Sequence, residues 1–168
     1  MPITVFRHRG PFDHSTRQIR ALKYFEDYLT EMTSDFTLPY PNTKYFNPSC
    51  IFHDNGTITR SADGIKSMMQ RVFGQFDKAI FKPRYLQVLD ESGVEKGRYT
   101  IIAELLVRYW FKGDEEPVEA PRLMVIEIGK GGTEEAYQGL AYDEVWLGWN
   151  VGILKEEKER RAKILDEK

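Results

Sequence analysis

The stretch that decides the fold is residues 47–73, NPSCIFHDNGTITRSADGIKSMMQRVF. It begins with an apolar run, residues 49–54, which ends in the polar pair His53 and Asp54. The Asn-Gly dipeptide that follows favours a tight turn. Apolar residues then recur at helical spacing over about 63–76. The stretch therefore predicts a short strand, a turn and a helix.

The residues upstream predict a second helix. Residues 16–33 carry apolar side chains at helical spacing, and a loop with three prolines, 35–48, separates this helix from the strand. Residues 1–14 contain two prolines and a glycine among β-favouring residues, so we interpret them as an extended arm.

The residues downstream predict a sheet. Segments that favour strands alternate with turn signals and cover residues 79–91, 97–112, 122–130 and 137–147. Because connections between them are short, they are expected to be consecutive antiparallel neighbours. In residues 150–168, Glu and Lys interleave at three- and four-residue spacings, which predicts a charged C-terminal helix.

Composition indicates one globular domain in 168 residues, with 41% hydrophobic and 30% charged residues. A net charge of −2 gives no electrostatic reason to expect a nucleic acid or an acidic membrane as partner. The single cysteine, Cys50, cannot form an internal disulfide, no Cys/His cluster has zinc spacing, and no glycine-rich phosphate loop is present. No metal and no cofactor are therefore expected. Without a long apolar run or a signal peptide, the predicted location is the cytoplasm.

Aromatic residues make up 13% of the chain, an excess that suits a cavity for an apolar ligand or an oligomer interface. Fewer than about half of the candidate residues are expected to touch a ligand, since Met and aromatic residues at helical spacing also form ordinary core. The candidates for binding a small apolar ligand are Tyr24, Tyr28, Tyr45, Met68, Met69, Tyr142, Trp146 and Trp149.

The predicted order of elements is an α+β arrangement in which a curved antiparallel sheet wraps the N-terminal helices into a cone, with a helix at the C-terminus. It resembles the nuclear transport factor 2-like superfamily, especially its SnoaL-like polyketide cyclases and scytalone dehydratases. The motifs that carry this resemblance are Phe52-His53-Asp54, Arg60, Gly64-Ile65 and Tyr142-Asp143. The resemblance implies one SnoaL-like domain over residues 15–168, preceded by the arm.

The activity that the resemblance implies is a cofactor-free isomerase, cyclase or dehydratase of secondary-metabolite biosynthesis. Such an enzyme moves a proton on a small apolar oxygenated substrate, for example a polyketide or a terpenoid. The sequence departs from the pattern in two places, because no histidine follows His53 and Leu140 stands where related enzymes have an acid. A non-catalytic ligand-binding module and an oligomerisation module of the same fold remain alternatives. The expected assembly is a homo-oligomer, most simply a dimer.

Four residues are candidates for the proton transfer. His53 and Asp54 leave opposite faces of a strand, and His53 is the candidate base because imidazole titrates near neutral pH. We interpret Asp54 as a turn-forming residue. His53 as a hydrogen-bonded strand-end residue is the alternative. Glu104 and Arg108 share one face of strand 97–112, where they could surround a ligand oxygen or simply face solvent or a partner subunit.

The fourth candidate, Glu144, lies on the last strand and is interpreted as a general acid or base. Two arguments about this strand disagree. The resemblance turns Tyr142, Glu144 and Trp146 toward the cavity, whereas simple amphipathicity turns the other face inward.

Overall fold

The computed structural model describes residues 3–34, 44–54, 56–93, 97–130 and 137–145, together with Glu159 and Lys163. For the last of these ranges, only the backbone is described.

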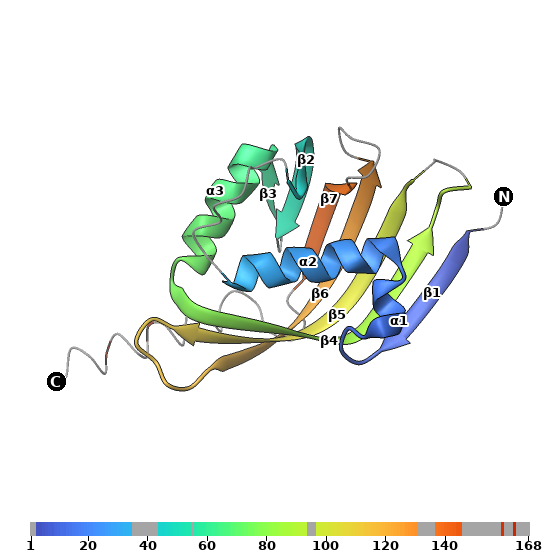
Figure 1. The fold of residues 1–168 in the computed structure, drawn as a ribbon. Coiled ribbons are helices and arrows are strands. Elements are labelled where there is room, and N and C mark those ends of the chain that lie inside the picture. The colour runs from blue at the N-terminus through green and yellow to red at the C-terminus, as the bar shows by residue number, and fades with distance from the viewer. Residues whose placement is uncertain are drawn as a thin grey trace.

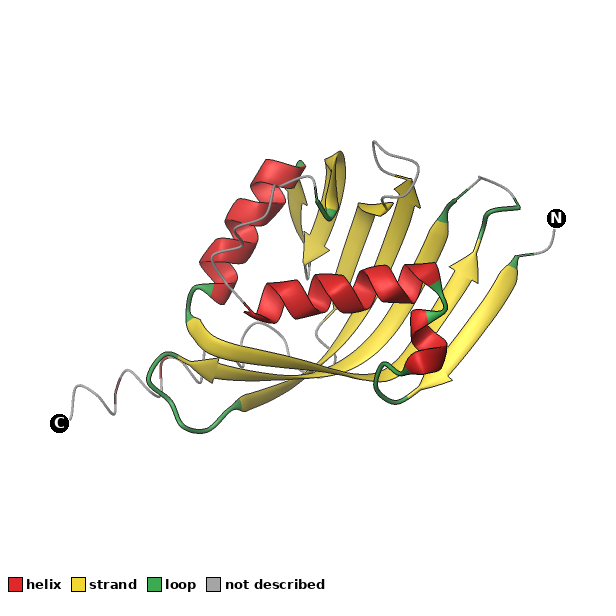
Figure 2. Ribbon diagram, in the orientation of Figure 1, coloured by secondary structure: helices red, strands yellow, loops and turns green. Residues whose placement is uncertain are grey.

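The described residues form a sheet of seven strands in the order β1-β4-β5-β6-β7-β2-β3 (Figures 1 and 2). Neighbouring strands are antiparallel, except that β2 and β7 are parallel. The strands are β1 (Thr4–Arg9), β2 (Phe46–Asp54), β3 (Thr57–Arg60), β4 (Phe76–Asp90), β5 (Tyr99–Phe111), β6 (Val118–Lys130) and β7 (Tyr137–Val145).

The helices lie on the concave side of this sheet (Figure 1). They are α1 (His14–Arg17), α2 (Arg20–Ser34) and α3 (Ala62–Phe73). The longest of them, α2, runs across the concave face, while α3 packs against β2 and β3 at one end. The curved antiparallel sheet with helices in its concavity confirms the predicted α+β class.

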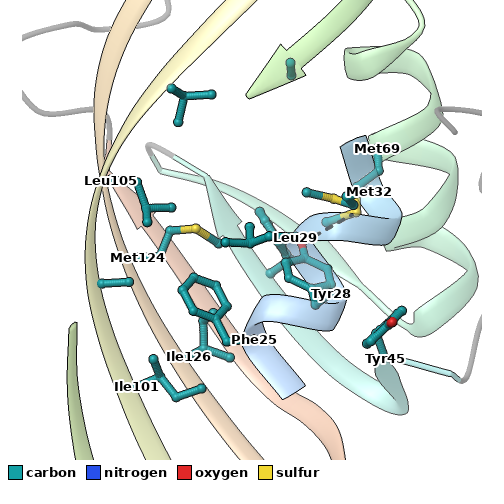
Figure 3. Close-up of a cluster of buried hydrophobic side chains, with 14 of the residues drawn as sticks. Phe25, Tyr28, Leu29, Met32, Tyr45, Met69, Ile101, Leu105, Met124 and Ile126 are labelled. Atoms are coloured by element: carbon teal, nitrogen blue, oxygen red, sulfur yellow. Dashed lines mark hydrogen bonds between the residues drawn. The ribbon is translucent and has the colours of Figure 1, made fainter. Parts of the chain in front are cut away.

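The core lies between α2 and the inner faces of β5 and β6. On β5, Ile101, Leu105 and Tyr109 belong to a set of alternate residues that are fully buried, while the residues between them are only half-buried. Figure 3 shows Phe25 and Leu29 pointing from α2 toward the sheet. The alternation of β5 is therefore the one predicted, with its apolar face in the core.

Two predicted segments differ from the structure, each for a local reason. The helix predicted over 16–33 is divided, because α1 ends after one turn at a C-cap residue, Gln18. The segment 55–61, predicted as a turn, contains β3, which pairs with β2 in a hairpin behind Gly56 at φ +87°. The extended segment predicted over 1–14 contains β1, which pairs with β4 along its whole length.

The predicted C-terminal helix lies outside the described residues, apart from Glu159 and Lys163, which are both helical and exposed. None of the helices in the described ranges has the length and apolar composition needed to cross a membrane.

Removal of the Phe25 side chain should destabilise the fold strongly. Phe25 is completely buried and its ring packs edge-on against Phe12, with 5.9 Å between centroids. We expect Phe25→Ala to lower the free energy of unfolding by about 3–5 kcal/mol, the range for a buried aromatic residue. Equilibrium unfolding in urea would measure this loss. The control Lys23→Ala, at an exposed position of the same helix, should change stability by no more than about 0.5 kcal/mol. Similar values for the two variants would contradict the packing described here.

Candidate functional site

A small pocket lies where α2, α3, β2 and β6 meet. The centre of a water molecule can reach about 20 Å³ of it, which is room for roughly one water. Its walls are mostly apolar, but two of the lining residues carry opposite charges. The lining residues are Tyr28, Met32, Phe52, Asp54, Met68, Met69, Val72, Phe73 and Arg122.

Arg122 supplies the positive charge of the pocket. It stands on the inner face of β6 between Ala120 and Met124, and only 3% of its surface is exposed. Its Nη1 donates a hydrogen bond of 2.8 Å to the hydroxyl of Tyr109, and its guanidinium carbon lies 5.4 Å from the ring centroid of Phe81. A buried charge is costly unless it is hydrogen-bonded, so these contacts hold the guanidinium in place.

Tyr109 is the neutral partner of Arg122. Its ring is fully buried and packs against Phe76, with 4.7 Å between centroids. Burial raises the pKa of Tyr109 to about 12, because the phenolate would lose its hydration; the nearby Arg122 opposes this rise and Asp54 adds to it. Tyr109 therefore stays protonated at neutral pH, and its oxygen accepts the hydrogen bond from Arg122.

Asp54 supplies the negative charge. Its Oδ1 atom is buried and has no hydrogen-bond partner among the described residues. The backbone is fixed on both sides, since Asp54 pairs with Thr57 of β3 and with Glu144 of β7. A buried carboxylate oxygen without a donor is rare in folded proteins and calls for a functional explanation. The pocket thus holds a carboxylate and a guanidinium in apolar surroundings.

His53, the predicted candidate base, does not line this pocket. Its side chain is exposed, while Asp54, which we interpreted as a turn-forming residue, lines the pocket. The predicted separation of the two onto opposite faces is correct. The sequence did contain a signal for the right choice, because Asp54 continues the alternation of Cys50 and Phe52, both buried.

Glu104 and Arg108 lie outside the pocket as well. Both are half-buried on the outer face of β5, and Arg108 donates a hydrogen bond to Glu119 of β6. This placement agrees with the alternative in which Glu104 and Arg108 face solvent or a partner subunit.

The predicted ligand-binding residues are divided by the structure. Tyr28, Met68 and Met69 line the pocket, whereas Tyr24 and Tyr45 are core residues whose hydrogen bond joins the Tyr24 hydroxyl to the Tyr45 carbonyl at 2.6 Å. Whether the first three bind a substrate stays a prediction.

The remaining candidates lie at the C-terminal end. In the backbone of β7, Tyr142 stands beside Phe52 and Glu144 stands beside Asp54. Trp146 and Trp149 lie outside the described residues, so the disagreement over the inward face of this strand stays open.

Sequence reasoning missed Arg122 and Tyr109 as site residues. Tyr109 lies on the buried face of β5, opposite the face of Glu104 and Arg108, and its hydroxyl was not considered. The signal for Arg122 was available: on β6 it interrupts a face that otherwise reads Val118, Ala120, Met124 and Ile126. A cation at an inward position of a strand needs a partner, and such residues mark sites. In the described part of the chain, no three His, Cys, Asp or Glu residues are grouped so that they could hold a metal ion.

Comparison with known proteins identifies the fold. No family model matches the chain, and no curated protein sequence is similar to it. Solved structures do match. A proposed scytalone dehydratase from Novosphingobium aromaticivorans is 9% identical, with a TM-score of 0.64 over 80% of this chain and 88% of the other.

Two further structures have similar scores. ActVI-ORFA from Streptomyces coelicolor is 13% identical, with a TM-score of 0.61 over 79% of this chain and 98% of the other. A nuclear transport factor 2-like protein from Salmonella enterica serovar Typhimurium is 13% identical, with a TM-score of 0.60 over 79% and 91%. The chain therefore has the nuclear transport factor 2-like fold, as the resemblance implied.

Stability should fall in alkali because of Tyr109. Its pKa of about 12 in the folded chain exceeds the ordinary 10.0, so the unfolded chain loses this proton first as the pH rises. The contribution of this proton to the free energy of unfolding is complete below about pH 10 and is lost as the pH rises toward about 12. The loss amounts to at most about 3 kcal/mol. Urea unfolding at a series of pH values would measure it in the native chain and in Tyr109→Phe.

The Tyr109→Phe variant separates the effect of Tyr109 from that of Cys50. Burial also raises the pKa of the Cys50 thiol to about 12, so Cys50 lowers stability in alkali in the same way. We expect a smaller alkaline loss in Tyr109→Phe than in the native chain. Equal losses would show that the Tyr109 hydroxyl is not held protonated.

Proposed function

We propose that this nuclear transport factor 2-like chain is an acid–base enzyme that moves a proton on a small, apolar, oxygenated substrate. The observation that carries the proposal is the Asp54 carboxylate oxygen, buried without a hydrogen-bond partner in the described residues, in a pocket that Arg122 also lines. Structures of the same fold include proteins named as a scytalone dehydratase and a dehydrochlorinase, which supports an enzyme.

Asp54 is the proposed base. The Oδ1 atom of Asp54 accepts no hydrogen bond from any residue that the structure describes, so its lone pairs are available for an acidic C–H of the substrate. It would take the proton from the carbon next to a carbonyl group, and the electron pair of that C–H bond would move onto the carbonyl oxygen as an enolate. Return of the proton from Asp54 to another carbon gives an isomerisation. In a dehydration, the enolate re-forms the carbonyl group and a carbon–carbon double bond while the C–O bond at the β-carbon breaks, and the departing hydroxide takes the proton from Asp54 and leaves as water.

Arg122 is the proposed stabiliser of the enolate. Its guanidinium is already oriented by Tyr109 and Phe81 before any substrate binds, so little reorganisation is needed when negative charge develops. Tyr109 is a positioning residue in this scheme, because it holds the guanidinium and does not line the pocket. The mostly apolar walls of the pocket favour a hydrocarbon skeleton, as in polyketides and terpenoids.

The second candidate is a non-catalytic module of the same fold. The observation that favours it is the size of the pocket, which has room for roughly one water. An oligomerisation module would need no larger cavity. The expected homodimer remains a prediction under both candidates.

Exchange of α-protons tests the catalytic proposal without knowledge of the natural substrate. The protein is incubated in D₂O with 2-butanone or cyclohexanone, and loss of the α-proton signal is followed by ¹H NMR. We expect Asp54→Asn to slow the protein-catalysed exchange by about 10²–10⁴-fold, the usual contribution of a general base.

The matched controls are Glu104→Gln, the same type of change on the outer face, and His53→Gln at the exposed neighbour. Both should retain the native rate. Equal rates in Asp54→Asn and the native chain would refute Asp54 as the base. Binding of the ketones without any exchange would favour the non-catalytic module.

A further inference from the structure

A second and larger cavity lies between α2 and β4. It is a groove in which the centre of a water molecule can reach about 180 Å³. The residues that line it are Phe12, Glu26, Leu29, Thr30, Ala79, Ile80 and Phe81. The groove shares no lining residue with the pocket of Asp54 and Arg122, so the two are separate spaces in this structure.

One aromatic ring stands between these spaces. Phe81 lines the groove, and its ring also lies against two residues that line the pocket. The guanidinium carbon of Arg122 is 5.4 Å from the ring centroid, and the ring of Phe73 is 6.4 Å away. Phe81 is only half-buried, so its ring has solvent on part of its surface.

The groove presents polar and apolar surface in about equal parts, although five of its seven described lining residues are apolar, and this lining holds no unpaired charge. Its only ionisable residue, Glu26, accepts hydrogen bonds of 2.9 and 2.7 Å from Arg17. Leu29 and Ala79 are buried core residues that form the floor. A neutral hydrocarbon group fits this chemistry, whereas a charged group would have to displace the Arg17 pair.

We propose that the groove binds the hydrocarbon part of the substrate while its carbonyl group passes Phe81 to reach Arg122. This inference rests on the proposed function, which places the carbonyl group of the substrate at Arg122. The pocket alone is far smaller than the 300–1,000 Å³ typical of ligand sites, so a substrate of more than a few atoms needs further space. The groove is the neighbouring space, and the ligand class that follows is a neutral ketone with an apolar tail.

Binding of a series of methyl ketones tests the proposal. The probes are 2-butanone, 2-hexanone and 2-octanone, which share one carbonyl end and differ in tail length, and their Kd values are measured by NMR titration. In the native chain we expect the affinity to rise two- to fourfold with each added methylene, approaching the value of about fourfold for complete burial.

Thr30→Trp fills the groove from an exposed position of α2 and should abolish this dependence on tail length while leaving 2-butanone binding unchanged. Lys23→Trp is the matched control, the same new side chain at an exposed position of the helix outside the groove, and should keep the native slope.

The tail site is refuted if Thr30→Trp keeps the native slope, or if affinity in the native chain is independent of tail length or undetectable for every ketone. Proton exchange of 2-butanone, which is too short to fill the groove, reports on Asp54 alone. If 2-butanone exchanges its α-protons but ketone affinity does not depend on tail length, only the proposal for the groove is refuted. If affinity depends on tail length but no α-proton exchanges, only the proposed catalysis is refuted.

Discussion

Strand alternation decides which side chains meet inside this protein. On β5 and β6 every second residue is buried, so any residue at such a position must either pack as core or find a polar partner there. Most of these positions hold apolar side chains of the core cluster to which Phe25 and Leu29 also belong. Two polar residues, Tyr109 and Arg122, occupy inward positions, and a hydrogen bond of 2.8 Å from Nη1 of Arg122 joins it to the Tyr109 hydroxyl. The guanidinium of the candidate site depends on this contact for its orientation.

Asp54 has no such compensation. Its buried oxygen lacks a donor among the described residues, and a buried unsatisfied acceptor typically costs about 1–3 kcal/mol. Proteins retain such a cost mainly where function requires it. The hairpin of β2 and β3 and the pairing with β7 hold the carboxylate in this unfavourable place. The strand pairing that keeps this unsatisfied oxygen buried, at a cost in stability, would also keep the proposed base in position for its substrate.

The sequence predicted the architecture better than the site, for a physical reason. Periodicity over ten or more residues averages out local exceptions, so α2, α3 and the long strands were recognised with errors only at their ends. β3 was missed because four residues, TITR, carry too little periodicity to distinguish a strand from a turn. The site depends on single side chains. His53 was preferred to Asp54 on intrinsic pKa, but the direction of a side chain is set by its strand, and Arg122 was overlooked although it interrupts an apolar face.

The parallel pairing of β2 with β7 also determines when the pocket can exist. Ile51 lies beside Ala141 and Asp54 beside Glu144, so the strand that carries the carboxylate is held by one that follows it by about half the chain. Contacts between such distant segments are slow to form, since the intervening chain loses entropy when they close. On the ribosome, β2 therefore emerges long before its partner. The carboxylate of Asp54 is therefore held in place only after β7 has been synthesised, and a nascent chain that ends before β7 would lack this pairing.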